Sequence, residues 1–348
     1  MTEDKLKRRK AALKAWDTIR KKKNKKAIND VGKIETYVDN KNLINNFDII
    51  TKDEIINWKG NGVIKLFNKT PHNIACGNFW EIRWAYGCPL NCNYCYLRGT
   101  MRGNMKQSYV KFDEIEKCVK EAFTYIKKGT IFNSGELCDS LMNPILMEKI
   151  VDLFEQQKKH KIFLLSKFGT DHIEFLLKKP RKQTICAWSI NAKTVAEKWE
   201  PNAANPIERL KAAEKVWDLG YDTRVRIDPI FPIDNWKLEY NNLIDVLFSN
   251  LLPNKIILGT PRGLWKTINY AEKAGVDMTW STFFKENTSW GKKISFEMRT
   301  EIYKFMIEKI ESFGYPIHNI SICKETVEML KSLNIKYNIN KCNCYGSL

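Results

Sequence analysis

The sequence contains no run of 18 apolar residues, so it predicts no transmembrane helix and no membrane partner. Its first residues are strongly basic and lack the apolar stretch of a secretory signal peptide, so no export signal is expected. No segment repeats along the chain, which indicates no repeat architecture. Ten cysteines without an export signal favour a reducing compartment, and we expect the protein in the cytoplasm.

Acidic residues are fewer than basic ones. The chain has 40 Asp and Glu against 58 Lys and Arg, which gives a net charge of +18. Residues 1–26 carry twelve Lys or Arg and three Asp or Glu, and this segment supplies half of the excess positive charge. A basic arm on a basic body favours a polyanionic partner, most simply a nucleic acid. The alternative is a tail that only aids solubility.

Three cysteines lie close together after a short apolar run. Cys88, Cys92 and Cys95 have the spacing Cys-x3-Cys-x2-Cys and follow a predicted strand at 79–86. Three thiolates on one tight loop can hold three irons of a four-iron cluster, which leaves the fourth iron open for a ligand that is not protein. Zinc prefers four ligands, and no second Cys-x2-Cys pair lies nearby. A disulfide framework suits short secreted chains, which this chain is not.

From residue 79 onward, short runs rich in β-branched and aromatic residues alternate with helical patterns. The predicted strands are 79–86, 129–134, 162–167, 184–190, 223–228 and 255–259. The predicted helices between them are 112–127, 143–158, 171–178, 206–218 and 239–251. Beyond residue 260 the pattern predicts helices at 264–274 and 296–312 and a short strand at 320–323. Regular strand–helix alternation predicts an α/β fold with a parallel sheet, and six units are too few for a closed eight-fold barrel.

The cysteine spacing resembles the radical S-adenosylmethionine (SAM) superfamily. This resemblance implies a [4Fe-4S] cluster whose open iron binds the amino and carboxylate groups of SAM. It also implies a partial (β/α)6 barrel of the TIM type, cleavage of SAM to a 5′-deoxyadenosyl radical, and a low-potential electron donor such as a flavodoxin or ferredoxin. The cofactor carries the difficult chemistry, while the protein orients it and excludes water.

With that fold in mind, we expect four segments. Residues 1–30 would form a basic arm, 31–78 an entry segment packed on the core, 79–262 the partial barrel, and 263–348 a small C-terminal α/β extension that completes the core. The hydrophobic content of 43% in 348 residues is enough to bury the core of such a domain.

Functional residues of such barrels gather at the carboxyl ends of the strands. After the second predicted strand, Gly135 and Glu136 resemble the superfamily motif that contacts the SAM amino group, with Glu136 as the acceptor. Lys167 and Ser189 end the next two strands, where a charge-assisted bond and a hydroxyl donor suit the SAM carboxylate. Asn191 follows closely and is expected in the same cofactor site. The alternatives are a surface Glu on a turn, a solvated Lys and an ordinary turn Ser.

A closer resemblance extends from residue 79 to about residue 232. The segments that carry it are Tyr94-Cys95-Tyr96-Leu97, Cys138-Asp139-Ser140, Ser166-Lys167-Phe168, Trp188-Ser189-Ile190-Asn191-Ala192 and Lys198-Trp199-Glu200-Pro201. They resemble the spore photoproduct lyase family of radical SAM DNA-repair enzymes, which reverse a methyl-linked thymine dimer to two thymines.

This resemblance implies roles for individual residues. The adenosyl radical would take a hydrogen from the lesion, and Cys138 would return one. Tyr94 and Tyr96 would relay the radical back towards SAM. Ser140, Lys167 and Ser189 would contact SAM. The residue types suit these roles, because a thiol S–H is a good hydrogen-atom donor and a phenol can carry a radical.

Three functions stay open at this point. The first is lesion repair, the second is radical SAM chemistry on RNA, a nucleotide or a peptide, and the third is a non-enzymatic iron–sulfur protein that binds nucleic acid and senses redox state. Cys138 favours the first, because an enzyme that consumes SAM needs no returning donor. A redox sensor would not cleave SAM when reduced. Cys323, Cys342 and Cys344 lie outside the family's functional pattern, and either a second metal site or simple packing would account for them.

Overall fold

The computed structural model describes residue 58, residues 60–71 and residues 73–335. The predicted basic arm at 1–30, the first part of the predicted entry segment at 31–57, and Cys342 and Cys344 lie outside the described residues. Within the described part of the chain, no helix is long and apolar enough to cross a membrane.

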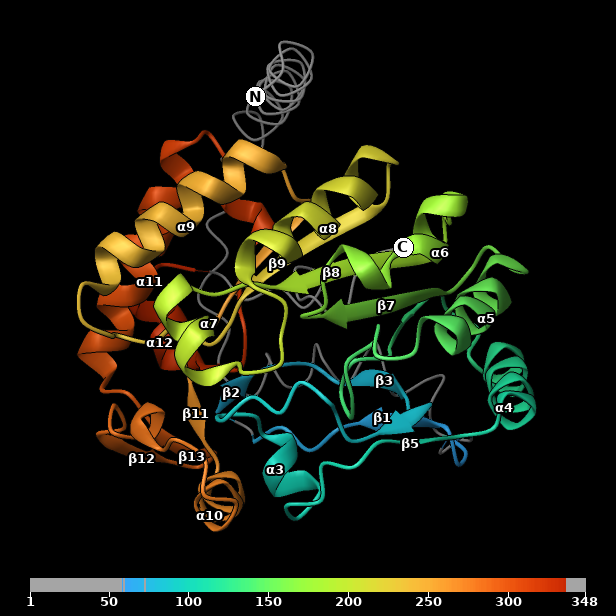
Figure 1. Cartoon of the computed structure of the whole chain (residues 1–348), viewed down its shortest axis with the longest axis horizontal. Helices are drawn as coiled ribbons and strands as arrows, with labels where there is room; N and C mark the ends of the chain where they lie inside the picture. The colour runs from blue at the N-terminus through green and yellow to red at the C-terminus, as the bar shows by residue number, and fades with distance from the viewer. Residues whose placement is uncertain (1–57, 59, 72, 336–348) are drawn as a thin grey trace, which may run out of the picture.

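An eight-stranded sheet forms the centre of the fold (Figure 1). Its strand order is β1 (Ile64–Phe67), β3 (Phe79–Ile82), β6 (Ile131–Asn133), β7 (Lys161–Ser166), β8 (Thr184–Ser189), β9 (Asp222–Ile227), β10 (Lys255–Leu258) and β14 (Ile320–Ile322). Neighbours from β3 to β14 pair in parallel, and β1 runs antiparallel to β3. Five of the six predicted strands are confirmed as single strands. The first, predicted at 79–86, is divided: β3 ends at Ile82, and β4 (Ala85–Tyr86) pairs with β5 (Ser108–Tyr109) in a separate sheet. The sheet adds β14 as a seventh parallel strand, which the prediction placed in the C-terminal extension.

Helices cover the outer face of this sheet, and Figure 1 shows them in an arc around the strands. The main helices are α4 (Phe112–Tyr125), α5 (Pro144–Glu155), α6 (Glu174–Lys178), α8 (Pro206–Asp218), α9 (Trp236–Asn250) and α11 (Phe296–Ser312). Helix α8 shows why they form where they do. The Asn205 side chain accepts a hydrogen bond from the Glu208 N–H at 3.0 Å, Pro206 occupies the first turn, and Gly220 ends the segment at φ +85°.

The structure also contains shorter helices that frame the strand ends. The sequence predicted α10 (Trp265–Lys273) but not α7 (Lys193–Trp199), which follows β8 directly. Helix α3 (Leu97–Thr100) follows the three-cysteine loop and packs against α10. A Cβ on Gly99 would lie only 2.7 Å from the backbone N of Thr267, so the contact between these two helices requires glycine.

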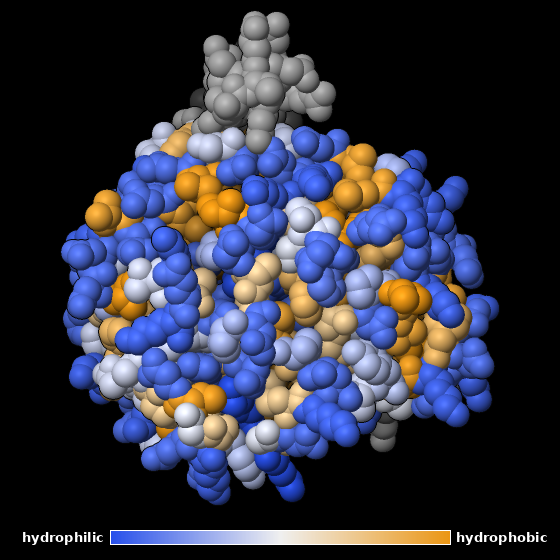
Figure 2. Space-filling view, viewed as in Figure 1, coloured by the Kyte–Doolittle hydropathy of each residue, from blue (hydrophilic) through white to orange (hydrophobic). Residues whose placement is uncertain are grey.

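The two faces of the sheet bury different side chains, because successive strand residues point to opposite faces. Side chains such as Phe132, Ile162 and Trp188 belong to the main core, which includes residues of the outer helices. The opposite face buries a separate cluster of Ile131, Phe163, Ile185 and Ala187. Hydrophilic side chains dominate the visible surface, where hydrophobic ones form separate patches (Figure 2).

A two-stranded ladder joins the two edges of the large sheet. Strand β2 (Ile74–Ala75) follows β1, and β15 (Glu325–Thr326) follows β14. The two short strands pair antiparallel, with Glu325 opposite Ala75 and Thr326 opposite Ile74. Segments from the beginning and the end of the described chain therefore lie side by side. The four predicted segment boundaries remain a prediction, although β1 and β14, which lie outside 79–262, belong to the same sheet as the strands within it.

Candidate active site

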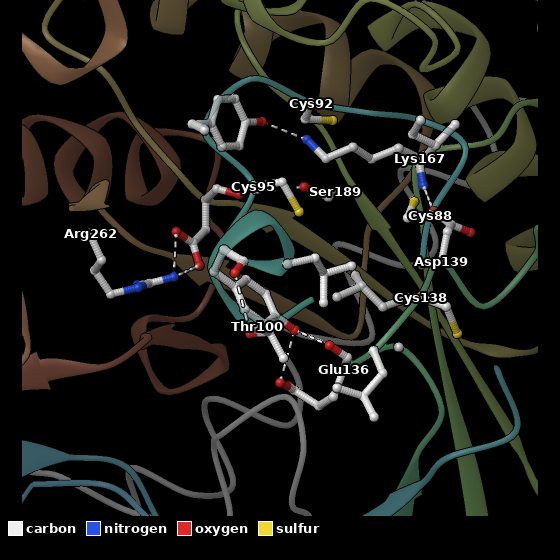
Figure 3. Close-up of a pocket in the computed structure, with 18 of the residues that line it drawn as sticks. Cys88, Cys92, Cys95, Thr100, Glu136, Cys138, Asp139, Lys167, Ser189 and Arg262 are labelled. Carbon is white, nitrogen blue, oxygen red and sulfur yellow. Dashed lines mark hydrogen bonds and ion pairs between the residues drawn. The ribbon is translucent and has the colours of Figure 1, made fainter. Parts of the chain in front are cut away.

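A pocket of about 450 Å³ lies at the carboxyl ends of the parallel strands (Figure 3). It brings together all but two of the residues predicted for the site. Those that line it are Cys88, Cys92, Cys95, Tyr94, Tyr96, Gly135, Glu136, Cys138, Lys167 and Ser189. The remaining two, Ser140 and Asn191, do not line it.

The cysteine loop is held in place by a buried arginine. The Arg98 guanidinium donates to the Cys92 carbonyl at 3.2 Å and to the backbone and side-chain oxygens of Asn91, both at 2.9 Å. Gly87, which opens the loop at φ +79°, has no room for a Cβ, because it would lie 2.4 Å from the carbonyl of Lys106. The sequence analysis missed Arg98, which only its position three residues after Cys95 could have indicated.

The three thiols of the cysteine loop all line the pocket. Figure 3 shows the Cys88, Cys92 and Cys95 sulfurs around one space. Among the described residues, no three His, Cys, Asp or Glu side chains are arranged to hold one metal ion. Burial raises the pKa of Cys92 to about 12 and also raises the pKa of Cys88 and of Cys95. Thiols in this environment ionise when a bound cation compensates the charge, as the irons of a cluster do.

Lys167 belongs to a buried charge network. Its ammonium donates to the Tyr94 hydroxyl at 2.8 Å and forms an ion pair with Glu200. The same Glu200 carboxylate accepts from the Tyr94 hydroxyl and pairs with Arg209, and the Glu200 and Arg209 side chains are fully buried. Burial alone would raise the pKa of Glu200, but the two cations outweigh it and hold that pKa at about 2. The network is therefore ionised, and it fixes the Tyr94 phenol at the pocket wall.

Tyr96 and Glu136 contact each other at another part of the wall. The Tyr96 hydroxyl donates to the Glu136 backbone carbonyl and lies 3.1 Å from its carboxylate. The Asn133 side chain donates to the other carboxylate oxygen of Glu136, also at 3.1 Å. The two predicted relay tyrosines therefore have different partners: Tyr94 contacts an ionised network, and Tyr96 contacts the loop that carries Glu136.

Cys138 is a buried thiol on the loop after β6. Its thiol donates a weak hydrogen bond to the Ser134 carbonyl, with Sγ 3.6 Å from the oxygen, and this bond orients the side chain. Burial, and next the neighbouring carboxylate of Asp139, raise the pKa of Cys138 well above its usual value. The sulfur therefore keeps its hydrogen at neutral pH, which a hydrogen-atom donor requires.

Ser140 and Asn191 lie behind the pocket wall. The Ser140 hydroxyl is 2.9 Å from the Ser134 hydroxyl and accepts from the Leu165 N–H at 2.9 Å. The Asn191 amide donates to the Pro229 carbonyl at 2.8 Å, and its oxygen accepts from the Tyr240 hydroxyl. In this structure both side chains hold the strand ends in position, and neither faces the cavity.

Four further residues that the sequence analysis missed line the same pocket. We call Phe67, Arg262, Trp290 and Lys324 the far wall, and all four line the pocket. In Figure 3, Arg262 lies across the cavity from Lys167.

The arginine of the far wall is bound to a buried carboxylate. Arg262 donates to Asp228 at 3.0 Å, and Arg226 donates to the same carboxylate at 3.0 Å. Burial alone would raise the pKa of Asp228, but the two guanidinium groups hold it at about 2.

These features define the class of the protein. A partial barrel of parallel strands, with a cluster-spaced cysteine loop at the carboxyl ends of the strands, is the fold of radical SAM enzymes. The model of the family described as spore photoproduct lyase matches residues 75–258, which is more than half of the chain. The chain belongs to that family.

The chain is also similar in sequence to individual spore photoproduct lyases. The chain is 27% identical over 175 residues to a spore photoproduct lyase of Clostridium acetobutylicum and 28% identical over 177 residues to one of Bacillus subtilis. These stretches are 47% and 48% of this chain, and the chain spans only 50% of each relative's length.

Solved structures show the same fold. A spore photoproduct lyase complexed with dinucleoside spore photoproduct has a TM-score of 0.59 and 22% identity, over 70% of this chain and 75% of that chain. A mutant of such a lyase with bound AdoMet and dinucleoside spore photoproduct has a TM-score of 0.60 over the same shares.

Proposed function

We propose that this chain is a radical SAM enzyme that repairs a thymine lesion in DNA, as a spore photoproduct lyase does. The observation that carries the proposal is a single pocket lined by the three cluster-spaced cysteines, by Cys138 and by both Tyr94 and Tyr96. Family membership supports it. Two solved structures of this fold support it as well, since both contain dinucleoside spore photoproduct and one of them also contains AdoMet.

The three cysteines would hold a [4Fe-4S] cluster, with the remaining iron left for SAM. When bound and reduced, these cofactors supply a 5′-deoxyadenosyl radical that takes a hydrogen atom from the substrate. The chain itself orients them and keeps water away. Buried Leu90 and Leu97 pack beside Cys88 and Cys92, so the cluster side of the pocket is apolar.

Lys167 and Ser189 would bind the SAM carboxylate, and Glu136 would accept from the SAM amino group. An ammonium has three N–H donors. Two of those on Lys167 are used by Tyr94 and Glu200, which leaves the third for a ligand. Ser140 and Asn191 would act indirectly, by fixing the two strand ends that present Glu136 and Ser189.

Cys138 would return the hydrogen atom to the substrate. Its S–H bond breaks, a C–H bond forms on the thymine carbon radical, and the unpaired electron remains on sulfur. Tyr96 and Tyr94 would then relay the radical: each gives up its phenolic hydrogen towards the sulfur and regains one, and 5′-deoxyadenosine would be the final hydrogen donor. The raised pKa of Cys138 favours this neutral transfer, because the thiol is not ionised at neutral pH.

This activity requires a substrate and an electron donor. DNA is the substrate, and a low-potential donor such as a flavodoxin or ferredoxin supplies the electron that reduces the cluster. A cytoplasmic location suits an oxygen-sensitive cluster and a chain whose cysteines stay reduced.

The test is anaerobic reconstitution of the cluster, followed by reduction in the presence of SAM and ultraviolet-irradiated DNA. Mass spectrometry should show loss of the thymine lesion, with less 5′-deoxyadenosine than repaired lesion because the radical returns towards SAM. SAM cleavage without loss of any thymine lesion would instead favour radical chemistry on RNA, a nucleotide or a peptide. Absence of SAM cleavage in a cluster-loaded protein would leave the redox-sensor function.

A further inference from the structure

The far wall of the pocket lies outside the part of the chain that the family model matches. The match covers residues 75–258, whereas Phe67 precedes it and Arg262, Trp290 and Lys324 follow it. The cysteine loop, Cys138 and Lys167 all lie within the match. The radical-generating side and the far wall are therefore separate parts of the sequence that meet at one cavity.

Lys324 has an unusual backbone. It connects β14 to β15 at φ +55°, in the left-handed region that residues other than glycine rarely adopt. The surrounding structure holds it there. The Cys323 N–H donates to the Leu258 carbonyl at 2.8 Å, and the buried Lys293 ammonium donates to the Lys324 carbonyl at 3.4 Å. Such strain persists only where neighbouring contacts impose it, and it concentrates at functional sites.

The Lys324 side chain lies between two aromatic rings. Its Nζ is 5.2 Å from the centre of the Phe67 ring and 5.1 Å from the centre of the Trp290 ring. A cation over a ring face is attracted by the electrons of the ring, so the two rings hold the ammonium in place. All three side chains line the pocket.

This ammonium has no anionic partner within the described part of the chain: neither an ion pair nor a hydrogen bond of its Nζ is found there. The Arg83 and Arg262 guanidinium groups, which also line the pocket, are already paired. Arg83 binds Glu81 at 2.8 Å, and Arg262 binds Asp228. Burial lowers the pKa of Lys324, but nearby negative charge, led by Glu136, outweighs it and raises that pKa, so the side chain stays charged.

We propose that Lys324, held between Phe67 and Trp290, binds a phosphate of a nucleotide substrate. This inference rests on the proposed function and adds a substrate-binding site to it. A lysine ammonium is a common phosphate ligand that acts as a point charge. Aromatic side chains beside a cation suit an unstacked nucleobase whose phosphate lies next to it. The SAM carboxylate has other proposed ligands, Lys167 and Ser189, at the ends of β7 and β8.

The test compares two forms of the thymine lesion, a dinucleotide with its bridging phosphate and a dinucleoside without it. Binding is measured anaerobically with cluster-loaded full-length protein, for the wild type and for Lys324→Met, which keeps the side-chain length and removes the charge. The variant should bind the dinucleotide about tenfold more weakly, which is the scale of one charged hydrogen bond. Its affinity for the dinucleoside and for SAM should not change.

Lys273→Met is the matched control. Lys273 also lies over a ring, that of Tyr270 at 5.4 Å, but it does not line the pocket. This variant should bind both lesion forms as the wild type does. Iron content and the circular dichroism spectrum of each variant show whether it folds and loads its cluster.

Equal affinities of Lys324→Met and wild type for the dinucleotide would overturn the inference, as would equal losses for both lesion forms. A loss of SAM affinity would assign Lys324 to the cofactor instead. If the wild type repairs no thymine lesion, the proposed function fails, and inorganic pyrophosphate replaces the lesion as the probe. Pyrophosphate binding that depends on Lys324 would then preserve the phosphate site. Binding that does not depend on it, or a preference for an acidic peptide, would remove the site.

Discussion

Lys167, directly after β7, and Glu200, directly after α7, form an ion pair with an N–O distance of 2.5 Å inside the protein. The Glu200 carboxylate is fully buried and also binds Arg209 and Tyr94. One carboxylate therefore fixes a predicted SAM ligand and a predicted radical carrier at the same time.

Glu200→Gln should destabilise the protein strongly. It leaves Lys167 and Arg209 without their counter-charge, and removing one partner of a buried ion pair costs about 3 to 5 kcal/mol. The measurement is urea denaturation of the cluster-free protein at neutral pH. The control is Glu208→Gln, which breaks an exposed pair with Lys211 and should cost less than about 1 kcal/mol. Equal losses for the two variants would show that the network adds nothing to stability.

Replacing any one of Cys88, Cys92 and Cys95 by alanine should abolish the cluster and SAM cleavage together, because three thiolates are the minimum set for three irons. Iron and sulfide analysis and 5′-deoxyadenosine release measure the two effects. Cys186→Ala is the control: this thiol is buried in β8 away from the pocket, and its loss should leave the iron content unchanged. A triple alanine variant that still cleaves SAM would contradict the cluster site.

Cys138→Ala should leave cluster content and SAM cleavage intact but change the fate of the substrate. Without the thiol hydrogen, the thymine carbon radical is quenched by other groups, so altered adducts should replace clean thymine. Mass spectrometry of the repaired DNA distinguishes the two results. Identical products and turnover in the variant and the wild type would reduce Cys138 to a small core residue, the usual place of a free cysteine.

His160 should make the protein less stable in mild acid. It is fully buried beside Phe123 and Phe132. Burial, and next the charge of Lys159, lower its pKa from 6.5 to about 4. The unfolded chain therefore binds the proton more tightly. The free energy of unfolding therefore keeps its full value above pH 6.5 and falls by roughly 3 kcal/mol as the pH decreases to about 4.

Urea denaturation at pH 7 and pH 5 measures this effect. His160→Phe keeps an aromatic ring between the two phenylalanines and removes the titrating group, so the stability of the variant should fall less over this pH range. The same fall in variant and wild type would show that other groups cause it.

Deleting residues 1–26 should weaken binding to duplex DNA equally for all sequences. Each phosphate that the basic arm neutralises adds about 0.9 to the slope of log affinity against log salt concentration. An arm with three or four contacts should therefore change that slope by roughly three units when it is removed. Titrations at several salt concentrations provide the slope. An unchanged slope would make the arm a solubilising tail.

Much of the fold follows from local sequence patterns. The strand at 162–167 was predicted within one residue of β7, because its apolar run is bounded by polar residues. β14 was recognised as a strand, but three residues cannot indicate which neighbour they pair with. The cysteine loop was predictable for a different reason, since its chemistry depends on spacing along the chain.

The rest of the site depends on contacts between distant segments. Glu200 lies 106 positions from Tyr94, and no local pattern marks it as the partner of that phenol. Ser140 was placed at the correct end of the sheet, but the loop after β6 turns its hydroxyl towards the Leu165 N–H and away from the cavity. Lys324 carries no motif, and its position is visible only once Phe67 and Trp290 lie on either side of it.

The ladder between β2 and β15 has a consequence for the order of synthesis. Ala75 and Glu325 are about 250 residues apart, so at 5 to 20 residues per second roughly 12 to 50 s pass between their emergence from the ribosome. During that interval the cysteine loop has already been made, whereas Lys324 and β15 have not. Phe67, Arg262 and Trp290 are made before Lys324, so the wall of the pocket is complete only when the last segment of the described chain has been synthesised.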